Sequence, residues 1–169
     1  MNIFILDTDP IIAAQHNCDT HVCKIILEAT QMLALTHQHF GLQFKNDAPQ
    51  KLQEGLYLPR GVGNHPVSRW VRQTSGNYEW TAKHAMELCI EYTKRYDKIH
   101  ATQHITNWLK NNNPFKTKEG QTPFIQAMPE EVKSDDPIQA YRNYYLVYKR
   151  HLVKYRLGNA PAWYTSSVL

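Results

Sequence analysis

The sequence predicts a mainly α-helical protein in which residues 1–169 form a single compact helical domain with a short extended N-terminal segment. Three observations lead to this prediction. The length of 169 residues suits one hydrophobic core. Apolar residues recur at helical spacing in several long stretches. No internal repeat, linker or low-complexity tract divides the chain.

The N-terminal third contains the first three predicted elements. Residues 2–6, NIFIL, are β-branched and aromatic, and they predict a short strand or extended segment that ends before Pro10. Residues 11–17 follow as a helical turn. Asp19 is a suitable N-cap for a helix over residues 20–38. One face of that helix is an apolar stripe at about 100° per residue, made of Val22, Ile25, Ile26, Ala29, Met32, Leu33 and Thr36.

The middle of the chain alternates loops and helices. Residues 41–63 hold four of the seven glycines and predict a long loop. A helix then begins with Asn64 as its cap and Pro66 in its first turn. Further helices are expected over residues 76–96 and 101–110.

The C-terminal third is predicted to hold a loop at 110–135 and one long helix. Asp136 is the expected cap of that helix and Pro137 its first residue, while Gly158 signals its end. The last residues, NAPAWYTSSVL, form an irregular tail.

Composition excludes several classes of protein. The net charge is +4 and the seven arginines are scattered, which suits an anionic ligand better than a duplex-DNA stripe. Cys18, Cys23 and Cys89 are an odd number without CxxC spacing, so we expect reduced thiols in the cytoplasm. No signal peptide or membrane span is expected. Walker, GxGxxG, HExxH and nucleophile-elbow motifs are absent from the sequence.

Four polar side chains form a second stripe beside the apolar stripe of the 20–38 helix. They are His21, Lys24, Glu28 and Gln31, spaced three, four and three residues apart. An imidazole, an ammonium and a carboxylate on one helix edge can hold a phosphate, a ribose or a base edge, and Glu28 can also act as an acid or base. The alternative is an internal helix network in which Lys24 and Glu28 form an i,i+4 pair.

A possible metal site and a possible anion site are weaker candidates. His84, Glu87 and Glu91 have the residue types of a divalent metal site, but a solvated helix face is the favoured interpretation, and no metal or cofactor is predicted. His65, at a helix start with Arg69 and Arg72 nearby, can bind an anion. The alternative is that His65 caps the helix.

The last helix carries aromatic and basic residues at helical spacing, namely Tyr141, Arg142, Tyr145 and Lys149. Such a pattern can stack a base and hold its phosphate. The favoured alternative is that the tyrosines pack in the core while the basic side chains lie over them.

Six stretches carry a resemblance to a known family: CDTHVCKIILEATQML, NHPVSRWVRQTSGNYEW, ELCIEYTKRY, TPFIQAMP, DPIQAYRNYY and APAWY. Together they resemble small phage-encoded proteins, which in turn are similar to the phage pyrimidine-dimer DNA glycosylases of the endonuclease V type. The resemblance covers most of the chain and implies a small helical DNA-repair scaffold.

The resemblance implies site residues as well. His21 and Glu28 match the family's His and catalytic Glu on the first helix, and Met1 would supply the nucleophilic amine. The later family motifs are matched by His65, Trp70 and Tyr78, and by Pro161, Trp163 and Tyr164.

The chain departs from the family at the nucleophile and at the phosphate contacts. Asn2 is too bulky for easy removal of Met1, and a one-residue extension displaces the nucleophile. Leu27 and Gln31 stand where the family has arginines that hold DNA phosphates, so duplex binding is expected to be weaker.

Two functions follow, with a structural or regulatory phage protein as a third. The favoured one is a non-catalytic binder that sequesters a small phosphorylated nucleotide signal, a cyclic nucleotide or an ADP-ribose derivative, as counter-defence in the cytoplasm of the infected cell. The alternative is a DNA N-glycosylase and abasic-site lyase with Glu28 as catalytic carboxylate and DNA as partner. The helical faces also permit a homodimer.

For the binder, the predicted ligand contacts fall into three groups. Phosphate is assigned to His21, Lys24 and His65. Ribose hydroxyls or a base edge are assigned to Glu28 and Gln31. Closure of the site is assigned to Arg69, Tyr78 and Arg142.

Overall fold

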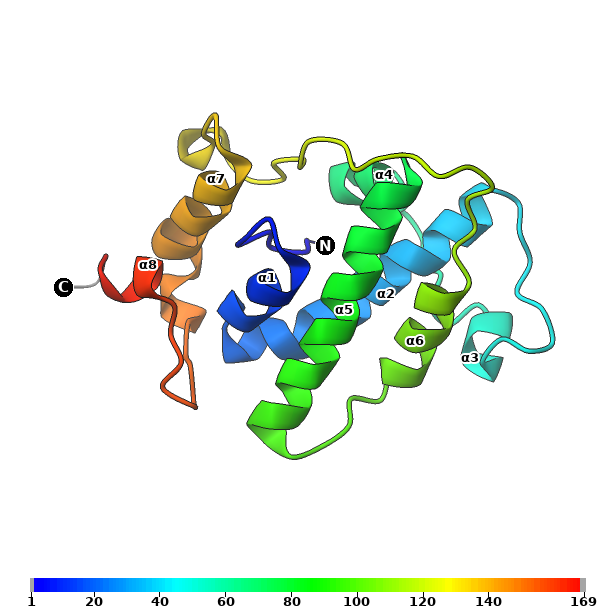
Figure 1. Ribbon diagram of the computed structural model, residues 1–169, viewed down its shortest axis with the longest axis horizontal. Helices are drawn as coiled ribbons and strands as arrows, with labels where there is room; N and C mark the ends of the chain where they lie inside the picture. The colour runs from blue at the N-terminus through cyan, green and yellow to red at the C-terminus, as the bar shows by residue number, and fades with distance from the viewer. Residues whose placement is uncertain (1, 168–169) are drawn as a thin grey trace.

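The computed structural model describes residues 2–167, and helices dominate them, as predicted (Figure 1). The α-helices are α1 Pro10–His16, α2 Asp19–His39, α3 Gln50–Gln53, α4 Pro66–Val71, α5 Ser75–Tyr96, α6 Gln103–Asn111, α7 Pro137–Tyr144 and α8 Ala162–Thr165. Three short helices complete the set: the 3₁₀ helices η1 Glu130–Val132 and η3 Arg150–Leu152, and the π-helix η2 Tyr145–Lys149. The structure contains no strand within residues 2–167.

Helices α2 and α5 cross at the centre of the fold, with α1 and α6 packed on either side of α5 (Figure 1). The apolar stripe predicted for α2 is buried along its whole length, from Val22 to Thr36. Across the crossing, α5 contributes Tyr78, Ala85 and Leu88 to the same core. Hydrophobic periodicity therefore predicted correctly which faces of the two long helices turn inward.

The N-terminal segment, residues 2–6, has no regular secondary structure, and it lies inside the fold instead of joining a sheet. Residues 3–6 are at most 5% exposed. Side chains from α5 and α7 take the place of a neighbouring strand. His84 Nε2 lies 3.2 Å from the Ile3 carbonyl, and Arg142 donates to the Leu6 carbonyl at 3.0 and 3.1 Å. Because a buried carbonyl needs a partner, these side chains fix the path of the segment.

The predicted cap of α2 is wrong by one residue. Cys18 is the N-cap and Asp19 is the first helical residue. The Asp19 carboxylate accepts from Arg95 Nη1 at 3.2 Å and from the backbone N–H of Arg156 at 2.9 Å. Arg95 also pairs with Glu91 at 3.1 Å. The Asp19 carboxylate therefore links α2 to α5 and to the C-terminal region instead of capping its own helix.

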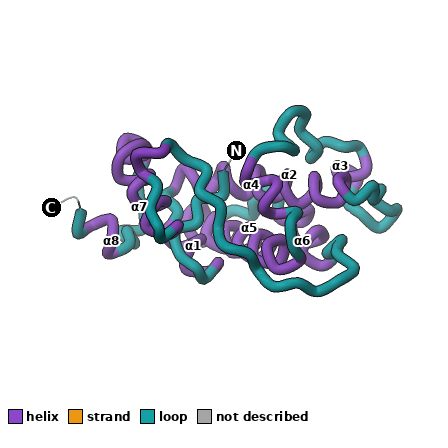
Figure 2. The backbone as a smooth tube through the Cα atoms, turned by 90° about the horizontal axis from the view of Figure 1, so that it is seen from above, coloured by secondary structure: helices purple, strands orange, loops and turns teal. Residues whose placement is uncertain are grey.

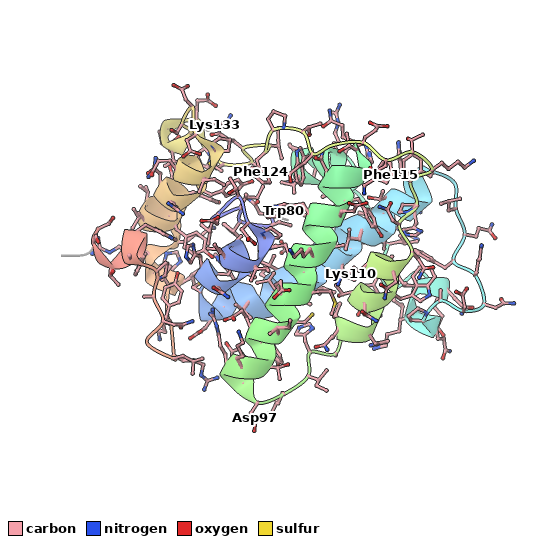
Figure 3. All side chains as sticks on the ribbon, viewed as in Figure 1. Trp80, Asp97, Lys110, Phe115, Phe124 and Lys133 are labelled. Atoms are coloured by element: carbon pink, nitrogen blue, oxygen red, sulfur yellow. The ribbon has the colours of Figure 1, made fainter. Side chains whose placement is uncertain are left out.

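The α6–α7 connection, residues 112–136, crosses the ends of α4 and α5 as a long loop (Figures 1 and 2). Gly76 at the start of α5 donates to the Glu119 carbonyl at 3.0 Å. A Cβ at position 76 would lie 2.5 Å from the backbone nitrogen of Gln121, so the close approach requires glycine. The Phe124 ring packs 5.1 Å from that of Trp80, and both side chains are labelled in Figure 3.

The last predicted helix is shorter than expected. Asp136 caps α7 by accepting from the Ile138 N–H at 2.9 Å, as predicted. The α-helix nevertheless ends at Tyr144 and continues as η2 and η3, so the prediction of a helix to Gly158 is wrong. The fully buried Tyr145 at the break is bonded to Asn17 and His21. The π-helix η2, whose turns are wider than those of an α-helix, begins at this tyrosine.

None of the helices within residues 2–167 combines the length and the apolar character needed to cross a membrane.

Candidate functional site

A cavity of about 340 Å³ opens where the N-terminal segment meets α2 and the C-terminal helices. Its walls come from five parts of the chain far apart in sequence. These are the N-terminal segment, one edge of α2, the turn at His65, Ala127 of the α6–α7 connection, and the region from Tyr144 to Leu152. A site built from so many segments is held together by the whole fold.

The structure brings four of the predicted ligand contacts together in this cavity. His21, Lys24 and Glu28 line it from α2, and His65 faces them from the start of α4. Positions i, i+3 and i+7 share one face of a helix, which is why these three α2 residues converge.

Glu28 is bonded to the start of the described chain. The backbone N–H of Asn2 donates to Glu28 Oε2 at 2.8 Å. Lys24 Nζ lies 3.5 Å from Oε1, and its side chain is 67% exposed, so this ion pair adds little to stability. The Asn2 side chain in turn donates to the Ala127 carbonyl at 2.9 Å. Through Asn2, the N-terminal segment and the α6–α7 connection are both linked to the Glu28 carboxylate.

Phe4 adopts an unusual backbone conformation at the base of the cavity. Its φ is +39°, in a region that non-glycine residues rarely enter. Its ring stacks on His21 at 4.2 Å and lies nearly parallel to Tyr144 at 5.9 Å. Strained residues cluster at functional sites, and so do π-helices such as η2, which contributes Lys149 to the same cavity.

His21 and His65 are both neutral at neutral pH. Burial, together with the nearby charges of Lys149 and Lys24, lowers the pKa of His21 to about 4. Burial also lowers the pKa of His65. The His65 Nδ1 atom accepts from the Val67 N–H at 3.3 Å, so this histidine caps α4, in place of the predicted Asn64. Neither ring offers the positive charge that phosphate contact was expected to use.

The positive charge of the cavity comes from two lysines. Lys24 and Lys149 line it, and Glu28 is the one acidic residue among the described lining residues. With both histidines neutral, two lysines and one carboxylate leave a net charge of +1. The cavity therefore favours a ligand that carries a small negative charge.

The other predicted ligand contacts lie outside this cavity. Gln31 is half-buried one turn beyond Glu28 and does not line it. Tyr78 is fully buried in the core and donates to the Leu109 carbonyl at 2.8 Å. Arg142 is bonded to the Leu6 carbonyl and pairs with Asp7 at 3.4 Å.

Arg69 lines a different and wider hollow of about 770 Å³ between α4 and the α6–α7 connection. An adjoining hollow of about 430 Å³ shares His39 and Arg72 with it. Both are more open than the Glu28 cavity. We place the candidate site at the Glu28 cavity, because acid, base and aromatic groups converge there.

The possible metal cluster on α5 is divided between separate structural contacts. His84 is fully buried, with its ring nitrogens 3.1 and 3.2 Å from the carbonyls of Pro10 and Ile3. Glu91 pairs with Lys94 and Arg95. Within residues 2–167, no three His, Cys, Asp or Glu side chains are grouped so as to hold a metal ion.

Sequence reasoning missed several residues of the cavity. Asn2, Phe4 and Tyr144 were not predicted, and Lys149 was noted only as part of the aromatic and basic pattern of the last helix. That pattern was the sequence signal for the wall formed by the region from Tyr144 to Leu152. Met1, the predicted nucleophile, lies outside the described residues.

No family model matches the chain, and neither the curated proteins nor the solved structures include a match to it.

Proposed function

We propose that this protein is a non-catalytic binder of a small phosphorylated nucleotide, which it holds in the Glu28 cavity. The observation that carries the proposal is the convergence of Lys24, Glu28 and Lys149 with the aromatic rings of Phe4 and Tyr144 on one enclosed space. Cations, an acceptor for hydroxyl or amino groups and flat apolar surfaces are the groups that nucleotide recognition requires.

Volume and charge narrow the class of ligand. About 340 Å³ is near the lower end of the ~300–1,000 Å³ typical of small-molecule sites. A net charge of +1 on the described lining suits a phosphate ester with one or two negative charges better than a triphosphate. A cyclic mononucleotide or an ADP-ribose derivative fits these conditions.

Each group in the cavity has a role in this proposal. Lys149 and Lys24 hold the phosphate by charge. Tyr144 supplies an aromatic face for the base, and Lys149 Nζ already lies 4.9 Å from that ring. Glu28, which pairs with Lys24, and His65 bond ribose hydroxyls between the base and the phosphate. In the setting of a phage, which the resemblance suggests, such binding would sequester a host defence signal.

The experiment is isothermal titration calorimetry with 3′,5′-cyclic AMP, 3′,5′-cyclic GMP and ADP-ribose. We expect one of these to bind reversibly and to be recovered unaltered after denaturation. Lys149→Met should weaken binding roughly tenfold or more, because a hydrogen bond to a charged group contributes about 1.5–3 kcal/mol. The matched control is Lys118→Met, at an exposed lysine of the α6–α7 connection.

Two results would contradict the proposal. One is that none of the three nucleotides binds, and the other is that the recovered ligand has been cleaved.

A second candidate function, an abasic-site lyase and DNA glycosylase, is favoured by one contact. The backbone nitrogen of Asn2 lies 2.8 Å from the Glu28 carboxylate. If residue 2 carried a free amine, that amine would be a nucleophile beside an acid–base group. A peptide nitrogen has no such reactivity. Borohydride trapping on abasic-site DNA tests this candidate, with Glu28→Gln as the negative control. Absence of a trapped species would exclude it.

A further inference from the structure

His21 is the last member of a buried hydrogen-bonded chain that runs from α1 to the cavity. Asn17, Tyr145 and His21 are each at most 4% exposed. The Tyr145 hydroxyl contacts Asn17 Oδ1 at 3.2 Å and is also bonded to His21 Nδ1. The Asn17 side-chain nitrogen donates to the Ala13 carbonyl at 2.8 Å. These contacts decide where each proton lies.

The direction of the chain follows from the Asn17 amide. Its nitrogen is bonded to Ala13, so the oxygen that faces Tyr145 can only accept. The single hydroxyl proton of Tyr145 therefore points at Asn17. The Tyr145 oxygen is left as an acceptor, and His21 Nδ1 must carry the proton that it receives.

Cys18 is the other polar group at this hydroxyl. Burial raises the pKa of the Cys18 thiol, so it stays protonated at neutral pH. A thiol is a weak acceptor and does not compete with the amide oxygen of Asn17 for the Tyr145 proton. The tautomer of His21 is thus set by the chain from Asn17.

The second ring nitrogen of His21 is open to the cavity. No residue among 2–167 bonds to Nε2, and the fully buried side-chain atoms without a partner in that range are Ser68 Oγ and Gln103 Oε1. His21 is one of the residues that line the Glu28 cavity, and the cavity is the open space beside its ring.

We infer that His21 is a specificity-determining residue whose Nε2 lone pair accepts a hydrogen bond from an N–H group of the ligand's base. The inference rests on the proposed nucleotide-binding function. We place the base beside the stacked rings of His21, Phe4 and Tyr144, which line the cavity. If a base presents a carbonyl oxygen or an unprotonated ring nitrogen here, its lone pair faces the lone pair of His21 Nε2, and the base binds more weakly.

His65, which also lines the cavity, has the opposite polarity. Because its Nδ1 accepts from the Val67 N–H, its proton is on Nε2. The two neutral histidines thus offer one acceptor and one donor. A nucleotide with a donor on its base and acceptor oxygens on its sugar or phosphate matches both.

The first test is ¹⁵N NMR of the full-length protein with labelled histidine at pH 7. We expect His21 to be protonated at Nδ1 and unprotonated at Nε2. A signal from an Nε2-protonated ring would overturn the inference without any ligand present.

The second test compares 3′,5′-cyclic AMP with its N6,N6-dimethyl analogue, which lacks the amino donor. We expect the analogue to bind about fivefold more weakly, the equivalent of one neutral hydrogen bond. Equal affinities would overturn this inference alone. Failure of cyclic AMP, cyclic GMP and ADP-ribose all to bind would overturn the proposed function and this inference with it.

The variant that changes the tautomer of His21 in both tests is Tyr145→Phe. Without the hydroxyl, His21 is free to protonate at Nε2, so the NMR tautomer should shift and the preference for the amino donor should fall. Tyr148→Phe, which removes an exposed hydroxyl bonded to Glu131, is the control. An unchanged tautomer in Tyr145→Phe would contradict the inference, and the wild-type NMR test stands even if this variant does not fold.

Discussion

The backbone N–H of Asn2 and the carboxylate of Glu28 are joined by a 2.8 Å hydrogen bond. The contact links residues 26 positions apart and places the start of the described chain against the third turn of α2. The same carboxylate faces the cavity that we propose as the nucleotide site. The site therefore depends on the position of the N-terminal segment, and the predictions below separate effects on stability from effects on binding.

Replacing Glu28 by alanine should reduce ligand binding more than stability. The variant loses one partly buried hydrogen bond, so we expect the free energy of unfolding to fall by about 1 kcal/mol. Affinity for the nucleotide that binds the wild type should fall at least roughly tenfold, since a charged acceptor is lost. Calorimetry and urea denaturation measure the two effects. Glu54→Ala, at the exposed acid that follows α3 as its C-cap, is the control. Unchanged affinity would remove Glu28 from the site.

Phe4→Ala should destabilise the protein by about 3–5 kcal/mol, the usual range for a buried aromatic residue. The ring is 5% exposed and stacks on His21, and alanine does not relieve the positive φ. Urea denaturation measures the loss. Phe40→Ala, at a ring that is 43% exposed, should cost much less. Equal losses in the two variants would argue against a special role for Phe4.

Stability should depend on pH through three buried histidines. Burial lowers the pKa of His21, His37 and His84 to about 4 from an ordinary 6.5. Between pH 6.5 and 4 the unfolded chain binds more protons than the folded protein, so stability is complete above pH 6.5 and falls as the pH drops through this window. Each histidine contributes up to roughly 3 kcal/mol. Urea midpoints from pH 4 to 8 test this. A flat profile below pH 6.5 would contradict it.

Gly76→Ala should disturb the α6–α7 connection. The added Cβ would lie 2.5 Å from the backbone nitrogen of Gln121, so the loop must move, at a cost of about 1–3 kcal/mol. Gly120→Ala is a close control in the same connection, because a Cβ there meets nothing within 4 Å. Thermal unfolding of the two variants distinguishes them. Equal melting temperatures would show that this close approach does not occur.

The helices were largely predictable because their signals are local. Apolar spacing gave the buried face of α2, and Asp136 followed by Pro137 gave the start of α7. Long-range contacts set the features that were not predicted. The Asp19 carboxylate bonds to Arg95 and does not cap α2. The hydroxyl of Tyr145, where α7 ends, bonds to Asn17.

The candidate site was predictable along α2 and at His65. The spacing of His21, Lys24 and Glu28 on one helix is visible in the sequence, whereas the approach of Asn2 and Lys149 depends on tertiary packing. Tyr78 was placed in the site because an aromatic side chain suits both a core and a stacking surface, and the sequence does not distinguish the two. Burial and a bond to Leu109 assign it to the core.

The most direct test of the central claim is an NMR titration of the ¹⁵N-labelled protein with the nucleotide that binds in calorimetry. If the Glu28 cavity is the site, the backbone amide signals of Asn2, Lys24 and Lys149 should shift on saturation, while those of Arg69 and Gln73 in the wider hollow stay in place. Shifts confined to Arg69 and Gln73 would place the ligand elsewhere and contradict the account.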